Sequence, residues 1–588
     1  MSKYSKKERK QLKKQRQSEI NEKSVSSVKK VVSKEKQIPY IKKIIKGNRV
    51  FIVILLIICF ALYANTLDNQ LTLVDDMQAF VFYPLTKDLW GSLKTLNIQQ
   101  TLYAISYQLF EFNPLPIRIV SVLVHMYITV LVFLFTYLVW NKKIAQISSL
   151  IFAVHAINTE AVTWISGAPY LYYALFTFTI LILYVLYFRG RGNKFLYIAA
   201  IIYVVEMVIM RSPWVLVSPM ALVVLDQLIL RRKFSLNKLW WIILFAIPVS
   251  IYLMIYFEDA YIARLEARSG GGTRVTLHTQ ALKPVTEGYP YSTYLMSKLY
   301  VFPKNLSVYY DGMEVNTALY VSMYTAFILY LATVVYTLVK NRQIAGILIM
   351  LPVLMAPAYS PIKITWFLAE RYLYSGTAFV GVLVAMGILW LDKKYKNKYI
   401  SYGVLGLILI VLSIRTVVRN EDWQDTETLS YANMKSSPLS VRPYNDMGGH
   451  FYYNGEVMVA VDWYEKALKV VPTSGTAINN LGYLYFELGP LLFWEELEWP
   501  EPNEATANSL FSQALSITKE GGDARTTSYF LNKSIVFNPN NVDTVLYTAD
   551  FYRSMDFIDD ARNLYIYAMR ADPGNEYAVA AINGLSNY

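Results

Sequence analysis

Two adjacent aspartates, Asp75 and Asp76, follow the first long apolar run of the chain, in a segment (67–83) that is itself largely apolar. Carboxylates beside a membrane are costly to desolvate, so such a pair indicates a functional site. Two neighbouring carboxyl groups resist ionising together, and partial burial raises their proton affinity further. One of them is therefore suited to take a proton from a hydroxyl group. The same residues would also fit a solvated loop or a helix cap.

A second polar group closes a later apolar run and contains His155, Glu160 and Trp164. His155 alone would fit a neutral core residue better than a ligand. With Glu160 and Trp164 close by, a polar site beside a sugar or a lipid headgroup becomes the better interpretation.

Two groups of arginines complete the set. Arg371, next to Glu370, has the planar donor geometry that binds a lipid phosphate through two hydrogen bonds. It could also extend to the membrane interface and pair with Glu370. Arg415 and Arg419 lead into Trp423 and fit an interfacial anchor at least as well as a ligand site.

The elements that must position these groups are membrane helices. With 55% hydrophobic and 17% charged residues in 588, the composition is that of a membrane protein. Apolar runs, each long enough for a bilayer, predict an all-α polytopic protein of about eleven transmembrane helices. We place the helices near residues 49–65, 116–140, 143–157, 170–188, 194–210, 213–230, 239–257, 317–339, 343–359, 372–390 and 398–416.

Basic residues orient these spans. Alternate connections carry Lys and Arg, and all fall on the same side as the basic N-terminus, which is therefore expected to be cytoplasmic. An odd number of spans puts the C-terminal region outside the cytoplasm, and all four polar groups meet at the outer face. The basic connections are residues 141–143, 189–191, 231–233, 340–342 and 392–394.

The two ends of the chain carry opposite charge. Residues 1–49 contain 17 Lys and Arg against 4 acidic residues, whereas residues 421–588 contain 10 basic and 23 acidic residues. The basic tail is expected to be disordered and to lie against anionic lipid rather than to bind nucleic acid. The first span begins too late for a cleavable signal peptide and is expected to be an uncleaved anchor.

From Arg442 onward, paired helical patterns recur with a period of roughly 34 residues and look like tetratricopeptide repeats. Gly482 is small enough for close helix contact, and an acidic insertion at 494–502 interrupts the second unit. Such a solenoid presents a groove for extended peptide, and its net negative charge favours basic partners. The alternative is that this region merely packs on the membrane body.

Motifs for metals and nucleotides are missing from the sequence. The four histidines are scattered, so no metal ligands are predicted, although dependence on a divalent metal stays open. Gly270–Gly272 precede no Lys-Ser/Thr pattern and favour a hinge over a phosphate cradle.

The order of the motifs resembles that of the transmembrane and tetratricopeptide-repeat-containing O-mannosyltransferases, which are C-type, lipid-phosphate-sugar-dependent glycosyltransferases. The resemblance covers about residues 50–588. It rests on Asp75-Asp76, His155 to Trp164, Leu225-Asp226, Tyr300 to Tyr310, Ala369 to Tyr374, Arg419 to Trp423 and the terminal repeats.

The resemblance implies the C-type glycosyltransferase fold and transfer of a sugar, typically mannose, from a polyprenyl- or dolichyl-phosphate donor to Ser or Thr of a protein, with inversion. It places Asp75 and Asp76 at the catalytic centre. It also carries over Thr159, together with His155, Glu160, Glu370 and Arg371; we expect the last four on the donor side.

The chain also departs from the family pattern. Ala168-Pro169-Tyr170 stand where the family usually has Arg and Asp, and the expected Lys-Glu pair is absent near residues 210–213. Arg211 could replace that lysine on the donor side. These departures leave the identity of the sugar open.

We therefore expect four parts: a cytoplasmic tail (1–48), a transmembrane glycosyltransferase domain (49–420), a linker (421–441) and an extracytoplasmic repeat domain (442–588). The expected partners are membrane lipid, the lipid-linked sugar donor and a protein or peptide acceptor bound by the repeats, with Trp164 and Tyr310 as acceptor contacts. The membrane would be the cell membrane in a prokaryote or that of the endoplasmic reticulum in a eukaryote.

Two alternatives remain at this point. The acceptor could be a lipid or a glycan, with the same class of donor. The protein could also be a membrane-anchored scaffold without enzymatic activity, whose repeats recruit partners.

Overall fold

The computed structural model describes residues 41–232, 248–249, 251, 284–310, 316–359, 367–488 and 501–585. Within these ranges the protein is helical and contains no strand, as the all-α prediction requires. The predicted span at 239–257, the glycines at 270–272, the insertion at 494–502 and the basic tail lie wholly or largely outside the described residues.

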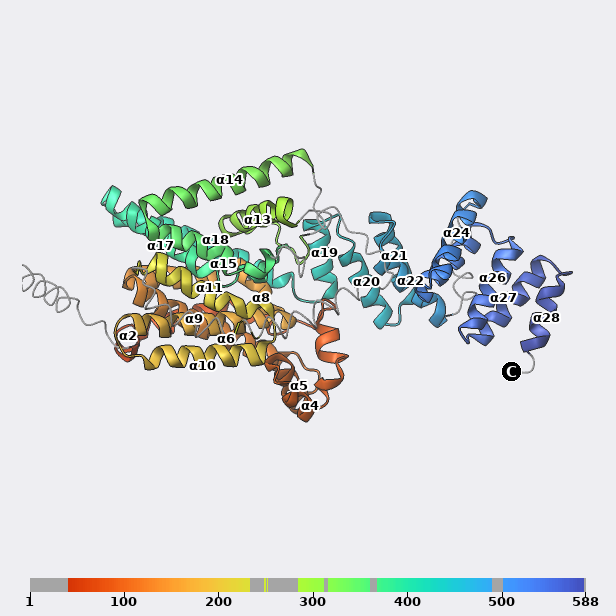
Figure 1. Cartoon of the computed structure of the whole chain (residues 1–588), viewed down its shortest axis with the longest axis horizontal. Helices are drawn as coiled ribbons and strands as arrows, with labels where there is room; N and C mark the ends of the chain where they lie inside the picture. The colour runs from red at the N-terminus through yellow and green to blue at the C-terminus, as the bar shows by residue number, and fades with distance from the viewer. Residues whose placement is uncertain are drawn as a thin grey trace, which may run out of the picture.

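The chain forms a bundle of long helices, with a row of shorter helices extending from one end of it (Figure 1). The bundle buries a single large apolar core, to which almost all of its helices contribute. Its helices are α2 (Ile41–Gly47), α3 (Arg49–Tyr63), α6 (Leu115–Val139), α7 (Lys142–Val154), α9 (Pro169–Phe188), α10 (Lys194–Met210), α11 (Val217–Val224), α13 (Tyr289–Val301), α14 (Thr317–Lys340), α15 (Arg342–Val353), α17 (Thr377–Tyr395) and α18 (Lys398–Glu421).

Helices occupy every predicted span that falls within the described ranges. Among the described residues, five segments are long and apolar enough to cross a membrane: Arg49–Thr66, Leu115–Val139, Ile165–Phe188, Thr317–Lys340 and Lys398–Glu421. Others are shorter, such as α7 with 13 residues and α15 with 12. The structure thus identifies a membrane protein, while the number of spans and their orientation stay predictions.

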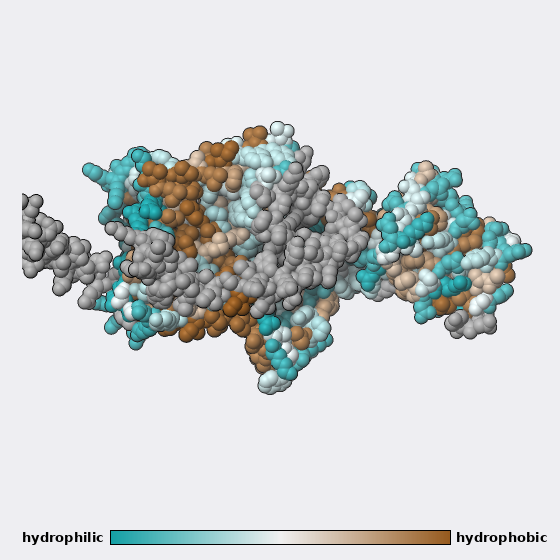
Figure 2. All heavy atoms as spheres, viewed as in Figure 1, coloured by the Kyte–Doolittle hydropathy of each residue, from teal (hydrophilic) through white to brown (hydrophobic). Residues whose placement is uncertain are grey.

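The surface of the bundle carries the residues that a bilayer would cover. Figure 2 shows an apolar band across the bundle, whereas the row of shorter helices is mainly hydrophilic. On α14, Val321, Ile328, Val335 and Val339 are each at least 60% exposed. An apolar surface of this extent on a water-soluble protein would be unstable against association.

Asparagines start three helices that follow basic connections predicted to face the cytoplasm. The side-chain oxygens of Asn141, Asn341 and Asn397 accept hydrogen bonds from the first turns of α7, α15 and α18. An Asn at this position satisfies one of the backbone N–H groups that have no partner within the helix. These caps allow the chain to reverse direction within a few residues.

The row of shorter helices has its own apolar core, separate from that of the bundle. The helices of the row pack against one another in chain order, except that the helix Gly475–Leu488 packs against Ala524–Phe537. Prolines at 472, 539 and 573 follow the ends of three of the helices. Their assignment as tetratricopeptide repeats stays a prediction. The helices are α19 (Thr426–Ser436), α20 (Arg442–Tyr453), α21 (Val457–Val470), α22 (Gly475–Leu488), α24 (Glu504–Lys519), α25 (Ala524–Phe537), α26 (Val542–Ser554), α27 (Ile558–Ala571) and α28 (Glu576–Leu585).

Gly482 allows α22 and α25 to approach closely, as its size predicts. A Cβ atom on Gly482 would lie 1.9 Å from the carbonyl oxygen of Arg525. Any side chain at this position would therefore force the two helices apart.

Candidate active site

The segment after α3 crosses the end of the bundle and is fastened to the start of the helix row. The backbone N–H of Gln70 donates to the carbonyl of Gln424 at 2.8 Å. The N–H of Leu73 donates to Oγ1 of Thr426 at 3.1 Å, across 353 residues of sequence. Hydrogen bonds between such distant segments fix the path of the chain immediately before Asp75.

The two aspartates occupy opposite environments. Asp76 is 1% exposed and accepts hydrogen bonds from the N–H and hydroxyl of Thr72 (3.3 and 3.1 Å) and of Ser166 (3.0 and 2.7 Å). Burial raises the pKa of Asp76, while the bonds from Ser166 and the charge of Arg118 act in the opposite direction. Asp76 therefore holds the loop in place.

Asp75 is exposed and has a backbone φ of 62°, a left-handed conformation that Asp tolerates better than most residues. Nothing in the described part of the chain donates a hydrogen bond to its carboxylate. The two aspartates are adjacent in sequence but differ in the structure: Asp76 is a buried anchor of the loop, and Asp75 carries an accessible carboxylate.

An aromatic cluster lies directly beneath this loop. The indole N–H of Trp164 donates to the carbonyl of Val74 at 2.8 Å, and its ring stacks on that of Trp423 with centroids 5.9 Å apart. Val308, Tyr309 and Leu429 belong to the same buried cluster. The ring of Trp164 is 4% exposed, so it positions the residue before Asp75.

Glu160, on the short helix α8 (Thr159–Thr163), forms a buried ion pair with the guanidinium of Arg371. The backbone N–H of Arg371, in α16 (Glu370–Leu373), donates to the other carboxylate oxygen at 2.8 Å. The guanidinium carbon also lies 5.0 to 5.6 Å from the ring centres of Trp164, Tyr170 and Tyr372. Ion pair and aromatic faces together hold a positive charge in a fixed orientation.

Glu370 does not pair with its neighbour Arg371. It binds Arg419 instead, at 3.1 Å, and the same oxygen accepts a hydrogen bond from the hydroxyl of Tyr310 at 3.0 Å. Burial raises the pKa of Glu370, and the charge of Arg419 opposes this shift.

Arg419 also bonds to Asp422 at 3.0 Å. Its side chain is fully buried, so Arg419 is not an interfacial anchor. Because Glu160 and Glu370 interact electrostatically, the two ion pairs form one network.

Two further candidates lie apart from this network. His155 is buried, its Nδ1 accepts a hydrogen bond from the N–H of Ile157, and its Nε2 lies 3.2 Å from the carbonyl of Tyr300. Both ring nitrogens are thus occupied by backbone, which fits a neutral core residue. Arg211 is exposed at the end of α10, where its Nε donates to the carbonyl of Val208.

Arg118 is a functional candidate that the sequence interpretation missed. It is 2% exposed near the start of α6, and its guanidinium donates to the carbonyls of Thr163 at 2.6 Å and Gln70 at 2.7 Å. It therefore ties both loops around Asp76 to α6. The sequence did contain a clue to its role, because an arginine within an apolar run is rare unless it has a polar partner.

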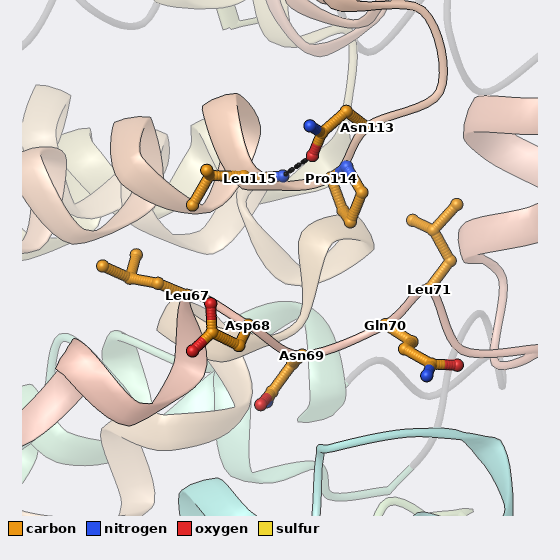
Figure 3. Close-up of a pocket in the computed structure, with 8 residues that line it drawn as sticks. All are labelled: Leu67, Asp68, Asn69, Gln70, Leu71, Asn113, Pro114 and Leu115. Carbon is orange, nitrogen blue, oxygen red and sulfur yellow. Dashed lines mark hydrogen bonds between the residues drawn. The ribbon is translucent and has the colours of Figure 1, made fainter.

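A pocket of about 480 Å³ lies between the segment that follows α3 and the start of α6, lined by residues 67–71 and 113–115 (Figure 3). The side-chain oxygen of Asn113 accepts a hydrogen bond from the N–H of Leu115, the first residue of α6, at 3.0 Å. Across the described ranges, no group of three or more His, Cys, Asp or Glu is arranged to hold a metal ion.

Comparison with known proteins gives relatives of a single kind. No family model matches the chain. The protein O-mannosyl-transferase TMTC3 of Mus musculus is 21% identical over 423 residues, covering 66% of this chain and 45% of the relative. TMTC3 of Homo sapiens is likewise 21% identical, over 424 residues (66% and 46%).

The protein O-mannosyl-transferase F38B6.6 of Caenorhabditis elegans is 22% identical over 418 residues, covering 66% of this chain and 56% of the relative. The chain spans about half the length of the curated relatives it matches. These similarities confirm the resemblance to the transmembrane and tetratricopeptide-repeat-containing O-mannosyltransferases.

Proposed function

We propose that the protein is a glycosyltransferase that moves a sugar, mannose in the first instance, from a polyprenyl- or dolichyl-phosphate donor to a Ser or Thr hydroxyl of a protein. The observation that carries this proposal is the accessible carboxylate of Asp75 on a loop anchored by Asp76. Buried arginine–glutamate pairs at the same end of the bundle support it. The printed names of the relatives favour the same activity.

The reaction is a single displacement. Asp75 accepts the proton of the acceptor hydroxyl, and the oxygen attacks the anomeric carbon from the side opposite the phosphate. The bond between that carbon and the phosphate oxygen breaks, and the lipid phosphate leaves with the electron pair. One displacement inverts the anomeric configuration, and no second carboxyl group has to protonate the leaving oxygen.

The lipid phosphate gains negative charge as it leaves, so it needs a cation more than an acid. Arg371 is our choice for this role, because Glu160 and three aromatic rings fix its guanidinium. Glu370 and Arg419 would support the same face, His155 would hold the donor side from within the core through its backbone contacts, and the exposed Arg211 would lie further out. Trp164 and Tyr310 would act on the acceptor side through the loops that they hold.

The organisation into tail (1–48), membrane domain (49–420), linker (421–441) and repeat domain (442–588) remains part of this proposal. The segment 421–441 includes α19, whose Leu429 and Asn433 are buried. Asn433 Oδ1 accepts a hydrogen bond from the N–H of Val308 at 3.0 Å. A helix held in this way would set the position of the repeats over the outer face.

The test is transfer by the purified full-length protein. It is incubated in lipid nanodiscs with a panel of radiolabelled polyprenyl-phosphate sugars and a library of Ser/Thr peptides. Label in peptide, removable by alkaline elimination, is the expected result. Label in a lipid or glycan fraction would favour the alternative acceptor. If no donor is consumed, the protein is not a transferase of this class and the scaffold alternative takes its place.

A further inference from the structure

Helix α20, the first helix of the predicted repeat domain, lies on the loop that carries Asp75. Arg442, Asp446, Gly449 and Tyr453 are spaced four, three and four residues apart and therefore share one face of the helix. A Cβ atom on Gly449 would lie 3.3 Å from the side chain of Leu73. At the end of the same face, the rings of Tyr453 and Phe82 lie 5.3 Å apart.

Asp446 is the acidic residue of this face. Its Oδ2 accepts a hydrogen bond from the hydroxyl of Tyr309 at 2.9 Å, and the guanidinium of Arg442 lies 5.6 Å from the centre of the Tyr309 ring. Tyr309 belongs to the buried cluster that contains Val74, the residue before Asp75. A chain of direct contacts therefore leads from α20 to the loop of the transfer site.

Asp446 and Asp75 are also coupled by charge. Burial raises the pKa of Asp446 to about 7, the bond from Tyr309 and the charge of Arg442 oppose the shift, and the charge of Asp75 adds to it. Burial raises the pKa of Tyr464 on α21, and Tyr453 and the charge of Asp446 add to this shift. The titratable and charged groups that face Asp446 are thus Asp75, Tyr309, Arg442 and Tyr464.

We propose that Asp446 is a positioning residue of the transfer site, which acts on Asp75 from the helix row. This rests on the proposed function. An ionised carboxylate at Asp446 accepts the hydrogen bond from the Tyr309 hydroxyl more strongly than a protonated carboxyl group does. Through Tyr309, Asp446 also holds the cluster that fixes the Asp75 loop. The helix row would then contribute Asp446 to the transfer site, in addition to presenting the acceptor.

A purely structural hydrogen bond would behave differently. Loss of such a bond would reduce activity by a similar factor at every pH. The positioning role acts through the charge of Asp446, which is present above about pH 7 and absent well below it. The pH dependence of transfer therefore separates the two roles.

The experiment compares kcat and KM of the full-length wild type with those of Asp446→Asn, from pH 5 to pH 9. Glu456→Gln, which removes an exposed charge just beyond α20, is the matched control. We expect Asp446→Asn to lower kcat about tenfold at pH 8 and by less than twofold at pH 5.5, with an unchanged KM for the donor. An unchanged profile, or an equal loss at all pH values, would overturn the proposal.

A second measurement tests the coupling of Asp446 to Asp75 even if the proposed function is wrong. If the wild type transfers no sugar, the proposed function has failed. The coupling is then tested by thermal unfolding of Asp75→Asn, Asp446→Asn and the double variant at pH 5 and pH 8. Non-additive shifts at pH 8 alone support coupling, and additivity at both pH values excludes it. If Asp446→Asn does not fold, Tyr309→Phe replaces it in both experiments, because it removes the hydrogen bond to Asp446.

Discussion

At the residue scale, the number of hydrogen bonds that each carboxylate accepts separates Asp75 from Asp76. Asp76 accepts four, from Thr72 and Ser166, and an amide in its place would turn acceptor atoms into donors. Asp75 offers its oxygens to solvent at a strained φ of 62°. The cost of holding that conformation is met by the anchor next to it, as is common at functional sites.

We expect Asp75→Asn and Asp76→Asn to fail in different ways. Asp75→Asn should lower transfer by about 10²- to 10⁴-fold, the usual contribution of a general base, without lowering the unfolding temperature. Asp76→Asn should lower the free energy of unfolding by about 1–3 kcal/mol, because buried donors lose their acceptor. Transfer assays and thermal unfolding in nanodiscs measure both effects.

Asp68→Asn, an exposed position on the same loop, is the control for these two variants. Full activity of Asp75→Asn would remove Asp75 from the reaction. An inactive but fully stable Asp76→Asn would reverse the roles of the pair.

Arg371→Ala should raise the KM for the lipid-linked donor more than tenfold, since both the cation and its ion pair with Glu160 are lost. Arg371→Lys should recover only part of the loss, because lysine lacks the planar donor pair. Initial rates at varied donor concentration give the KM values, with exposed Arg570→Ala as the control. A donor KM equal to that of the wild type would exclude Arg371 from the phosphate site.

The ion pairs illustrate what the sequence could not reveal about single residues. Glu370 and Arg371 are adjacent, which suggests a local pair, but neighbouring residues of a helix point in different directions. Their partners, Arg419 and Glu160, lie 49 and 211 residues away. Polar residues at the ends of apolar runs identified the members of the network, and only the packing of α8, α16 and α18 determined the pairing.

At the element scale, the helices follow from the sequence more directly than the loops do. Apolar runs located α3, α6, α9, α14 and α18, because burial in core or bilayer requires continuous hydrophobic stretches. The path of residues 65–76 had no comparable signal. It depends on hydrogen bonds to residues 420–426, which no local pattern encodes.

Gly482→Ala tests the close packing of α22 against α25. A methyl group there would meet the backbone of Arg525, so we expect a loss of about 1–3 kcal/mol in unfolding free energy. Gly584→Ala in α28 is the matched control, because nothing lies within 4 Å of its added methyl group and alanine favours a helix. Chemical unfolding of both variants gives the difference, and equal stabilities would contradict the packing described.

At the scale of the whole molecule, the bundle and the helix row share a buried junction. Tyr309 and Val308 from the bundle side bond to Asp446 and Asn433 from the helix row. Deleting residues 442–588 would therefore remove Asp446 together with the groove that we predict for the acceptor. Loss of activity in that deletion cannot distinguish a protein acceptor from a lipid acceptor, so point variants within the helix row are the sharper test.

The junction should also make stability depend on pH. The folded-state pKa of Asp446 is raised to about 7, above that of the unfolded chain, so protonated Asp446 favours the folded state. This stabilisation is fully present below about pH 4 and is lost as the pH rises through about 7. The unfolding temperature of Asp446→Asn minus that of the wild type should therefore increase from pH 5 to pH 8. A flat difference across this range would show that Asp446 titrates normally.

The bonds between residues 65–73 and 417–426 have a consequence for the biogenesis of the protein. Asn65, Gln70 and Leu73 form hydrogen bonds with Val417, Gln424 and Thr426, some 350 residues later. During synthesis, the loop with Asp75 reaches its side of the membrane long before those partners exist. Under the proposed function, the nascent chain would carry the Asp75 carboxylate on a loop without these bonds until α18 has been made, and activity would begin only at that late stage of assembly.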